Sequence, residues 1–347
     1  MIPDTSFISR CLELAQKGSG KVAPNPMVGS VLVFNDKIIG EGFHQVFGES
    51  HSEVNAIKQC IEKGNEYLLE KSVLYVNLEP CSHSGKTPPC TDLIIKHKIP
   101  KVVIGMMDPF PEVNGKGIKK LEDAGIKVVS GILEKECREA NHRFITFHSL
   151  KRPYIVLKFA QTADHFIAPI QNKNNKISNE FTDILVHKWR SEESAILIGT
   201  KTAEIDNPVL TVRKWSGKNP IRIVMDKNLR LPGKLHLFDH SVSTLVFNSI
   251  KNEKGMNIEF IKIDFDDFVI SKILSTLYER KILSVLVEGG RNVLSQFIEK
   301  NLWDEARIIT ADKLFKDGIR SPEIQGKEIS KSNATGDNIV ILRRENR

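Results

Sequence analysis

Apolar segments of strand length alternate with amphipathic segments of helix length along this chain, and that alternation limits the folds available to it. Strands separated by helices of this length favour a mainly parallel sheet with helices on both faces. In the first half the pattern predicts helices over 5–16, 53–63, 91–97, 115–124 and 133–147, and strands over 28–34, 37–42, 73–78, 101–107 and 126–129.

The alternation is interrupted once, at residues 148–153, where Pro153 ends a helix and a new strand begins. A chain of 347 residues is long for one ordinary domain. We therefore predict two α/β domains, over residues 1–148 and 153–347. In the second half the pattern predicts strands over 154–160, 195–198, 221–225, 244–247, 258–263 and 284–287, and helices over 179–192, 266–280 and 292–299.

Net charge and hydropathy exclude few classes of binding partner. The net charge of +7 suits a nucleic acid, an anionic membrane or a phosphorylated substrate, but the lysines are scattered, which favours an ordinary solvated surface. No apolar run approaches the roughly 18 residues of a membrane span. The first twenty residues lack the basic and apolar regions of a secretory signal. These features predict a cytoplasmic enzyme.

The five cysteines fall into two groups. An odd number in a cytoplasmic chain argues against a disulfide framework. Cys11, Cys60 and Cys137 lie in apolar helical patterns and are expected to be buried, inert thiols. Cys81 and Cys90 instead lie in a loop rich in Pro, Ser and Gly, where a packing role is harder to supply.

His51 and Glu53 at a helix start, followed by Cys81 and Cys90, form the most informative pattern. One imidazole and two thiolates suit Zn²⁺ and leave a fourth position for water, whose pKa the metal lowers. A nearby carboxylate then moves protons. The arrangement matches the H-x-E and P-C-x-x-C signature of nucleobase zinc deaminases, except that eight residues separate the two cysteines here.

A structural zinc site is the alternative to a deaminase centre. Such a site is normally closed by a fourth protein ligand, and His83 in the loop between the cysteines is the available one. Cys90 leads into the predicted helix 91–97, whose N-terminus would stabilise a thiolate. The carboxylate of Glu53 has no role in a structural site and therefore favours catalysis.

The loop between the cysteines also carries a family resemblance. Four segments closely resemble the deaminase half of the bifunctional riboflavin-biosynthesis deaminase/reductase family: A-P-N-P-M-V-G at 23–29, G-F-H at 42–44, H-S-E-V-N-A at 51–56 and L-E-P-C-S-H-S-G-K-T-P-P-C at 78–90. The resemblance implies a cytidine-deaminase-like three-layer α/β/α fold. It implies that His51, Cys81 and Cys90 hold zinc and that Glu53 is the proton shuttle.

The same resemblance implies a set of residues that bind the pyrimidine and its ribose phosphate: Asn25, His44, His83, Lys86 and Asp108. Ordinary turn chemistry is the alternative, because Asn25 lies between prolines and Asp108 precedes one.

In the second half the residues themselves give one weak signal. Glu288, Gly289 and Gly290 stand between a predicted strand and a predicted helix, where glycines admit a ligand and helix N–H groups favour phosphate. The spacing is not G-x-G-x-x-G, so no Rossmann domain is predicted. A plain strand-to-helix turn is the simpler interpretation.

The resemblance continues across this half, through L-K-F-A at 157–160, W-R at 189–190, I-G-T at 198–200, D-N-P-V-L-T-V-R at 206–213, P-I-R-I-V-M-D at 220–226 and E-G-G at 288–290. It implies a dihydrofolate-reductase-like α/β fold that uses NADPH to reduce the ribosyl group to ribityl by hydride transfer to C1′. The implied NADPH contacts are Ala160, Lys176, Thr202, Asp206, Asp226, Gly290, Arg291, Asn292, Val293, Leu294, Ser295 and Gln296. The implied substrate contacts are Asn174, Arg190, Leu210, Arg213 and Glu288.

Two positions depart from the pattern of this family. His165 stands where the family commonly has glycine, and Lys176 stands in a segment where it commonly has a tryptophan that packs on the cofactor. Lys176 cannot stack in that way but can pair with a phosphate. An exposed, solvated role is the alternative for Arg190, whereas two arginines suit a phosphomonoester.

The sequence therefore predicts a bifunctional enzyme that acts on a small phosphorylated pyrimidine, with Zn²⁺ and NADPH, without nucleic acid or membrane partners, and as a homo-oligomer. One alternative keeps the deaminase and makes the second half a degenerate or binding domain. Another is a nucleic-acid deaminase, against which the long inter-cysteine loop and the lack of an aromatic stacking surface both count. A zinc-binding interaction protein is the third.

Overall fold

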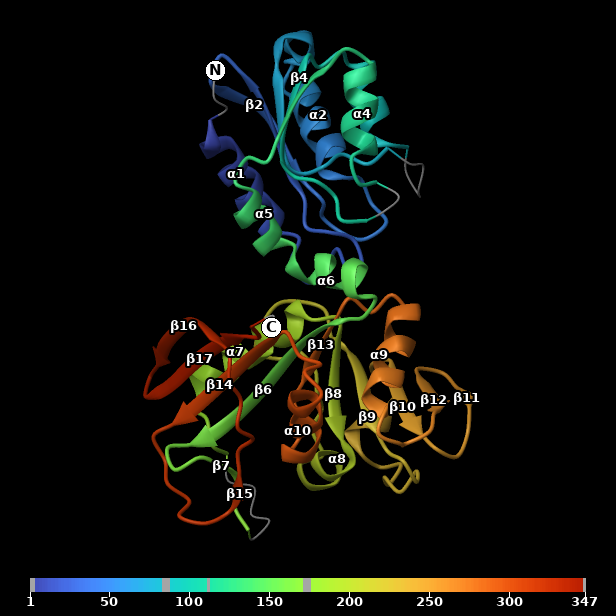
Figure 1. Ribbon diagram of the computed structural model, residues 1–347, viewed down its shortest axis with the longest axis vertical. Coiled ribbons are helices and arrows are strands. Elements are labelled where there is room, and N and C mark those ends of the chain that lie inside the picture. The colour runs from blue at the N-terminus through green and yellow to red at the C-terminus, as the bar shows by residue number, and fades with distance from the viewer. Residues whose placement is uncertain (1–3, 83–87, 111–112, 171–175, 346–347) are drawn as a thin grey trace. The chain divides into compact units, whose positions relative to one another are not determined.

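The computed structural model describes residues 4–82, 88–110, 113–170 and 176–345. The chain forms two compact units, Met1–Lys151 and Arg152–Arg347 (Figure 1). Within the described residues, every helix is too short or too polar to cross a membrane.

The first unit is built on a five-stranded sheet in the order β2-β1-β3-β4-β5. Its strands are β1 (Gly29–Phe34), β2 (Lys37–Phe43), β3 (Val73–Leu78), β4 (Lys101–Met106) and β5 (Lys127–Ser130). β3, β4 and β5 are parallel, whereas β1 runs antiparallel to both neighbours. The sheet is thus mixed rather than mainly parallel, because the tight turn at Asn35 and Asp36, both with positive φ, reverses the chain between β1 and β2.

Helices cover both faces of this sheet, as the three-layer prediction requires. Alternate residues of β1 face opposite ways, so Val31 packs against α1 (Thr5–Gln16) while Leu32 packs against α2 (Ser52–Glu62). α3 (Cys90–Lys96) and α4 (Lys116–Asp123) share the face of α2, and α5 (Glu134–Ala140) shares that of α1. A 3₁₀ helix, η1 (Glu66–Lys71), precedes β3.

The predicted single helix over 133–147 is wrong. The chain forms two helices there, α5 and α6 (His142–Leu150), which meet at Asn141. The Asn141 side chain accepts a hydrogen bond from the Met27 amide at 2.8 Å and donates one to the Met27 carbonyl at 3.0 Å. This anchor holds Asn141 on the loop before β1 and breaks the helical path.

The second unit contains a ten-stranded sheet in the order β11-β12-β10-β9-β8-β13-β6-β14-β17-β16. Seven strands run parallel: β6 (Tyr154–Thr162), β8 (Ala195–Gly199), β9 (Ile221–Met225), β10 (Thr244–Asn248), β12 (Ile258–Lys262), β13 (Ser284–Val287) and β14 (Glu305–Ala311). Three at the edges are antiparallel: β11 (Glu253–Lys254), β16 (Lys327–Ala334) and β17 (Asp337–Arg343). β7 (Phe166–Ala168) and β15 (Ile319–Arg320) pair separately.

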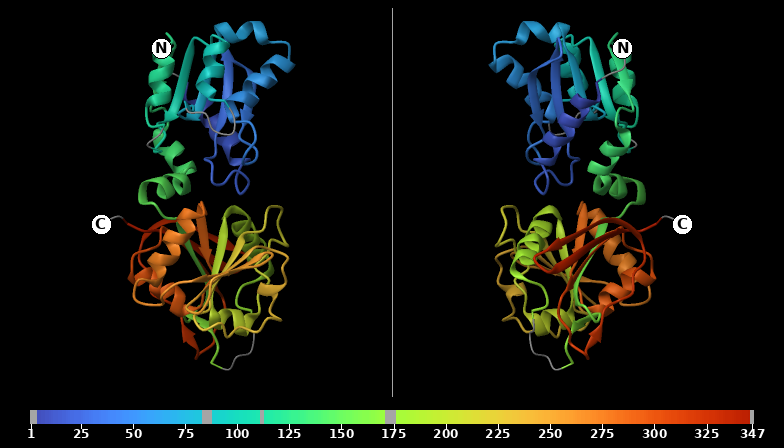
Figure 2. Two further views of the ribbon diagram at one scale, coloured as in Figure 1. Left: turned by 90° about the vertical axis from the view of Figure 1, so that its right-hand side faces the viewer. Right: turned by 90° about the vertical axis from the view of Figure 1, so that its left-hand side faces the viewer.

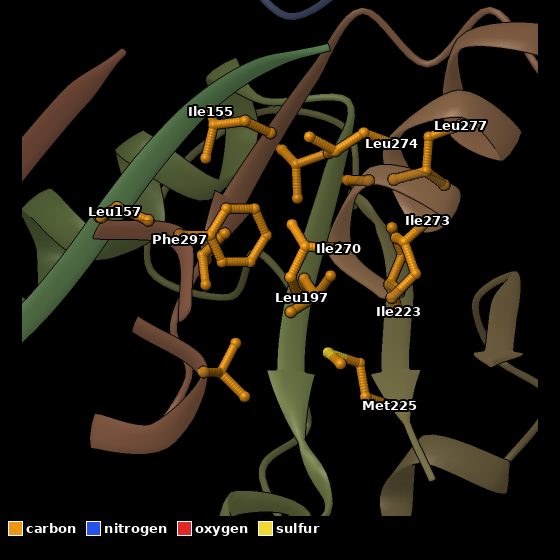
Figure 3. Packing of buried hydrophobic residues seen from close by; sticks show 14 of the residues in the cluster. Ile155, Leu157, Leu197, Ile223, Met225, Ile270, Ile273, Leu274, Leu277 and Phe297 are labelled. Carbon is orange, nitrogen blue, oxygen red and sulfur yellow. The ribbon is translucent and has the colours of Figure 1, made fainter. Parts of the chain in front are cut away.

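Helices again cover both faces. On one face, Ile155, Leu197 and Ile223 pack against α9 (Val269–Glu279) and α10 (Arg291–Glu299) in a continuous apolar core (Figure 3). Figure 2 shows the ribbon of this unit from two further sides. The other face is covered by α7 (Glu180–Glu192), α8 (Thr200–Asp206) and the 3₁₀ helix η2 (His236–Phe238). Because the central strands are parallel, their carboxyl ends lie at one edge, where ligands bind in open α/β sheets.

Candidate functional site

Three side chains in the first unit converge on one point. The Nδ1 atom of His51 lies 3.5 Å from the Cys81 sulfur and 3.4 Å from the Cys90 sulfur. All three potential ligand atoms lie within 4.8 Å of one another. A tetrahedral zinc ion with usual bond lengths would separate a nitrogen and a sulfur ligand by about 3.5 Å. The donor set and its spacing therefore fit zinc.

Helix starts and a strand end bring these residues together. His51 immediately precedes α2, Cys90 is the first residue of α3, and Cys81 follows the end of β3. The Cys90 amide donates to the Cys81 sulfur at 3.4 Å. Hydrogen bonds from Cys90 and from His51 outweigh burial and lower the pKa of Cys81 to about 4, so this sulfur is a thiolate at neutral pH and ready to bind a cation.

Glu53 lies in the first turn of α2 and is only 3 % exposed. Its carboxyl interacts electrostatically with Cys81, His51 and Cys90, which places it near the three potential ligands. Burial, and then the charge of Cys81, raise the pKa of Glu53. A carboxylate with a raised pKa accepts and returns protons more readily near neutral pH.

Asn25 and His44 lie against this centre. The ring of His44 stands edge-on to the ring of His51, with centroids 5.4 Å apart. The His44 Nδ1 is 3.1 Å from the Ser50 carbonyl and its Nε2 is 3.1 Å from the Asn25 amide nitrogen. Because the carbonyl requires a donor, Nδ1 carries the proton and Nε2 accepts. Burial lowers the pKa of His44, which favours the neutral form of the ring.

Asp108 follows β4 and is 7 % exposed. Burial raises its pKa to about 7, against a hydrogen bond from the Phe110 amide that lowers it. The charge of Cys81 contributes to this shift, which places Asp108 near the cysteine loop. His83 and Lys86, the other two predicted substrate contacts in this half, lie outside the described residues.

Glu79 was not singled out from the sequence, and the structure gives it a definite role. Its buried carboxylate accepts four backbone N–H groups, from Asp108, Gly115, Gly117 and Ile118, at 2.9–3.2 Å. It thereby joins the cysteine loop to the segment that carries Asp108 and to the start of α4. A charged residue at the end of an apolar strand was the available signal.

In the second unit, several of the residues predicted to bind the cofactor lie on segments that follow the carboxyl ends of the parallel strands. The Thr202 hydroxyl on α8 accepts a hydrogen bond from the Gly290 amide at 3.0 Å. Asp226 follows β9 and caps the next turn by accepting from the amides of Arg230 and Leu231. Ala160 lies near the end of β6, and Asp206 ends α8.

Helix α10 starts at this edge without a side-chain cap, which leaves its N-terminus suited to an anion. Arg291 and Asn292 are exposed there, and Ser295 and Gln296 are partly buried. Val293 and Leu294 differ, since their side chains lie in the hydrophobic core. Any contact that these two make with a cofactor would come from their backbone.

Gly199 and Gly289 allow α10 to approach the sheet. A Cβ atom at Gly199 would lie 2.7 Å from a Val293 methyl, and one at Gly289 would lie 2.8 Å from the Val293 Cβ. Both contacts are shorter than real side chains allow. Gly289, which precedes this helix in the sequence, is thus required by packing whether or not a ligand binds.

Arg190 and Glu288 form a two-pronged ion pair, with N–O distances of 3.0 and 2.7 Å. Both side chains are about one-tenth exposed. Burial opposes the ionisation of Glu288, but the charges of Arg190 and Lys158 outweigh it and lower its pKa to about 2. Burial lowers the pKa of Lys158. Lys158 was quoted in the L-K-F-A segment but was not predicted to have a role.

Further cations lie around the same ion pair. The Arg213 amide donates to the His187 ring at 3.0 Å, and the charges of both Arg190 and Arg213 act on His187. Lys176 is paired with Asp183 on α7, which also binds Lys214 at 3.2 Å. His187 was missed from the sequence because nothing in its local pattern distinguishes it from a core histidine.

Two other residues were predicted to contact the substrate, Leu210 and Asn174. Leu210 is 2 % exposed in the core and has a φ of +55°, so its backbone rather than its side chain would meet a ligand. Asn174 lies outside the described residues.

Known proteins show the same two-part organisation. Residues 1–106 match the cytidine and deoxycytidylate deaminase zinc-binding region, and residues 153–335 match the RibD C-terminal domain. These matches and the geometry define a zinc-type deaminase domain followed by a reductase domain of the RibD kind.

The similarity extends over the whole chain. The Riboflavin biosynthesis protein RibD of Aquifex aeolicus is 36% identical over 338 residues, 95% of this chain and 92% of its own. The corresponding protein of Synechocystis is 36% identical over 94% and 89%. A Thermotoga maritima diaminohydroxyphosphoribosylaminopyrimidine deaminase/5-amino-6-(5-phosphoribosylamino)uracil reductase superimposes with a TM-score of 0.89 at 38% identity, covering 98% of both chains. The chain belongs to the RibD family of riboflavin biosynthesis proteins.

Proposed function

We propose that this chain catalyses two successive steps of riboflavin biosynthesis. The first is hydrolytic deamination of 2,5-diamino-6-(5-phosphoribosylamino)pyrimidin-4(3H)-one, and the second is reduction of the ribosyl group, which gives 5-amino-6-(5-phosphoribitylamino)uracil. The observation that carries the proposal is the convergence of His51, Cys81 and Cys90 with the buried carboxyl of Glu53, in a chain whose relatives are RibD proteins.

In the deaminase unit, His51, Cys81 and Cys90 would hold zinc, which would supply Lewis-acid activation of a water molecule. Glu53 would take a proton from that water and return it to the departing amino group as ammonia. The raised pKa of Glu53 suits both transfers. Asn25, His44 and Asp108 would bind the pyrimidine, with His83 and Lys86 as further proposed contacts.

In the reductase unit, a nicotinamide cofactor would supply the hydride that reduces C1′. The proposed cofactor is NADPH, held by the uncapped start of α10 and by Thr202, Asp206 and Asp226. Arg190, Arg213 and Glu288 would bind the substrate. Reduction with ring opening also needs a proton, and Lys158 is the further charged side chain that interacts with Glu288 in this group.

Lys176 is paired with Asp183 and belongs to the group of cations around Arg190. A contact with a cofactor phosphate stays a prediction for it, as it does for the remaining residues assigned by resemblance. A cytoplasmic location and a homo-oligomeric state also stay predictions, and size-exclusion chromatography with light scattering tests the latter.

One experiment tests both activities. Metal content, ammonia release from the diaminopyrimidinone ribotide and NADPH oxidation are measured on the same preparation of full-length protein. We expect about one zinc per chain, from the three-ligand site that the described part of the chain contains. Ammonia release should not depend on NADPH, whereas NADPH oxidation should require the deaminated intermediate.

The alternatives give different results in the same assay. Ammonia release without NADPH oxidation at saturating protein would leave a deaminase with a degenerate second domain. Bound zinc without ammonia release would favour a zinc-binding interaction protein. Salt-sensitive binding of single-stranded RNA would favour a nucleic-acid deaminase.

A further inference from the structure

A short chain of hydroxyl groups lies behind the carboxyl of Glu53. The Ser52 hydroxyl donates to the Oε2 atom of Glu53 at 2.9 Å, and the Ser30 hydroxyl oxygen is 2.6 Å from that of Ser52. Both serines are completely buried. Neither serine is among the predicted site residues, so the deaminase mechanism described above does not use them.

The fold places the two serines opposite each other. Ser30 is the second residue of β1 and pairs with Gly42 and Val76 in the sheet. Leu32, two residues along, packs among side chains of α2, so the Ser30 side chain faces the same helix. Ser52 is the first residue of α2. The strand thus presents a hydroxyl to the residue that precedes Glu53.

The hydrogen-bond directions follow from the donor count. A hydroxyl has one proton, and Ser52 gives its proton to the carboxylate of Glu53. The Ser52 oxygen must then accept from Ser30, although the distance alone allows either direction. The chain runs from Ser30 to Ser52 to Oε2, and each donor strengthens the next.

Ser52 follows the N-cap residue His51, so its hydroxyl does not occupy the capping position and donates to a side-chain carboxylate. Ser72 provides the contrast within the same unit. It is equally buried, yet its hydroxyl bonds only to the Leu69 carbonyl, at 2.9 Å. Burial alone therefore does not require a serine to contact a carboxylate.

We propose that Ser52, supported by Ser30, is a positioning residue for Glu53. By occupying Oε2 it fixes the plane of the carboxyl and leaves Oε1 as the oxygen that takes the proton from water and passes it to the departing amine. This inference rests on the proposed deaminase function. Its effect should fall on the proton transfers and not on substrate binding, because neither serine needs to contact the substrate for this role.

The test compares four variants of the full-length protein: Ser52→Ala, Ser30→Ala, the double variant, and Ser72→Ala as the matched buried control. We expect Ser52→Ala to lower kcat for ammonia release about tenfold with little change in KM, the size of effect of one hydrogen bond to a charged group. Ser30→Ala should lower kcat about threefold by the same reasoning. The double variant should match Ser52→Ala, since Ser30 acts through Ser52.

Zinc content and thermal unfolding are measured on each variant. Ser72→Ala should lose stability and keep its kcat. An unchanged kcat in Ser52→Ala with zinc retained would overturn the proposal, as would a loss equal to that of Ser72→Ala or a rise in KM alone. Multiplicative losses in the double variant would overturn the role given to Ser30. Absence of ammonia release by the unsubstituted protein would instead refute the proposed function itself.

Discussion

The two units of this chain build their sites in different ways. In the deaminase unit the proposed site residues come from short segments, at a helix start and around one loop, and His51 lies two residues from Glu53. In the reductase unit they come from β6, α7, α8, β9, β13 and α10. The first site is a group of potential metal ligands, whereas the second is a group of mutually compensating, partly buried charges.

The difference shows how each site should respond to change. A site of metal ligands and one proton carrier should fail almost completely when the carrier is removed, without loss of fold. A site of mutually compensating charges should lose stability and activity together, because each charge also stabilises its neighbours. Four substitutions test that contrast.

Glu53→Gln should have the largest effect. Removal of a general acid-base group typically costs 10²–10⁴ in rate, so we expect ammonia release to fall about 1000-fold. Zinc content should be unchanged, since the carboxyl is not among the three converging ligand atoms. NADPH oxidation with the deaminated intermediate should also be unchanged. Loss of zinc from this variant would show that the two roles are not separate.

Glu288→Gln should affect the other unit. It leaves Arg190 and Lys158 without their counter-charge, so NADPH oxidation should fall about 100-fold and the free energy of unfolding by about 3 kcal/mol. Ammonia release should be retained. Glu299→Gln, at an exposed carboxylate near the end of α10, is the control and should change neither quantity.

The Arg190–Glu288 ion pair predicts that the stability of the protein depends on pH. The pKa of Glu288 falls from 4.5 to about 2 on folding, so its ion pair contributes stability that is complete above pH 4.5 and is lost as the pH drops through about 2. The stability difference between the unsubstituted protein and Glu288→Gln, measured by urea unfolding, should therefore be constant above about pH 5 and shrink below it. A difference that vanishes near neutral pH would contradict this assignment.

Glu79→Gln should have an intermediate effect in the deaminase unit. The amide can accept at only one of its two positions, so some of the four N–H groups lose their acceptor. We expect ammonia release to fall about tenfold and hydrogen exchange at Gly115 and Gly117 to accelerate. Glu122→Gln on the exposed face of α4 is the control. Unchanged exchange would show that Glu79 does not anchor this segment.

His165→Gly should have the smallest effect. His165 has a φ of +64° in an exposed turn, where glycine avoids strain but adds freedom to the unfolded chain. We expect a gain in stability of about 0.5 kcal/mol and no change in NADPH oxidation. A loss of activity would mean that this departure from the family pattern contacts a ligand.

The sequence predicted that His51, Cys81 and Cys90 converge, as the structure shows, because these residue types in this pattern are chemically unusual; their binding of zinc stays a prediction. It predicted helix 5–16 and strands 73–78, 221–225 and 284–287 with the observed bounds, since their apolar periodicity agrees with their burial. It missed α8, β14, β16 and β17, and the break at Asn141. A strand such as β16, exposed along its length, has no buried face to create a pattern.

The missed site residues share another cause. Ser52, Glu79 and Lys158 interact with partners on other elements of the fold: Ser30, the segment from Asp108 to Ile118, and Glu288. Nothing local in a sequence shows that a serine will meet a serine of a strand or that a lysine will lie beside a glutamate of another strand. Tertiary contact, and not residue type, gives these groups their roles.

The close packing of Gly199 and Gly289 on Val293 has a consequence for ligand binding. Because the turns after β8 and β13 both contact one side chain, and Gly290 is bonded to Thr202, the two turns cannot separate without opening the core. A cofactor that binds at these two turns would find a preorganised binding site, and little binding free energy would be lost to ordering the chain. Even one added methyl group at Gly199 or Gly289 would displace Val293 and so disturb both turns of that binding site together.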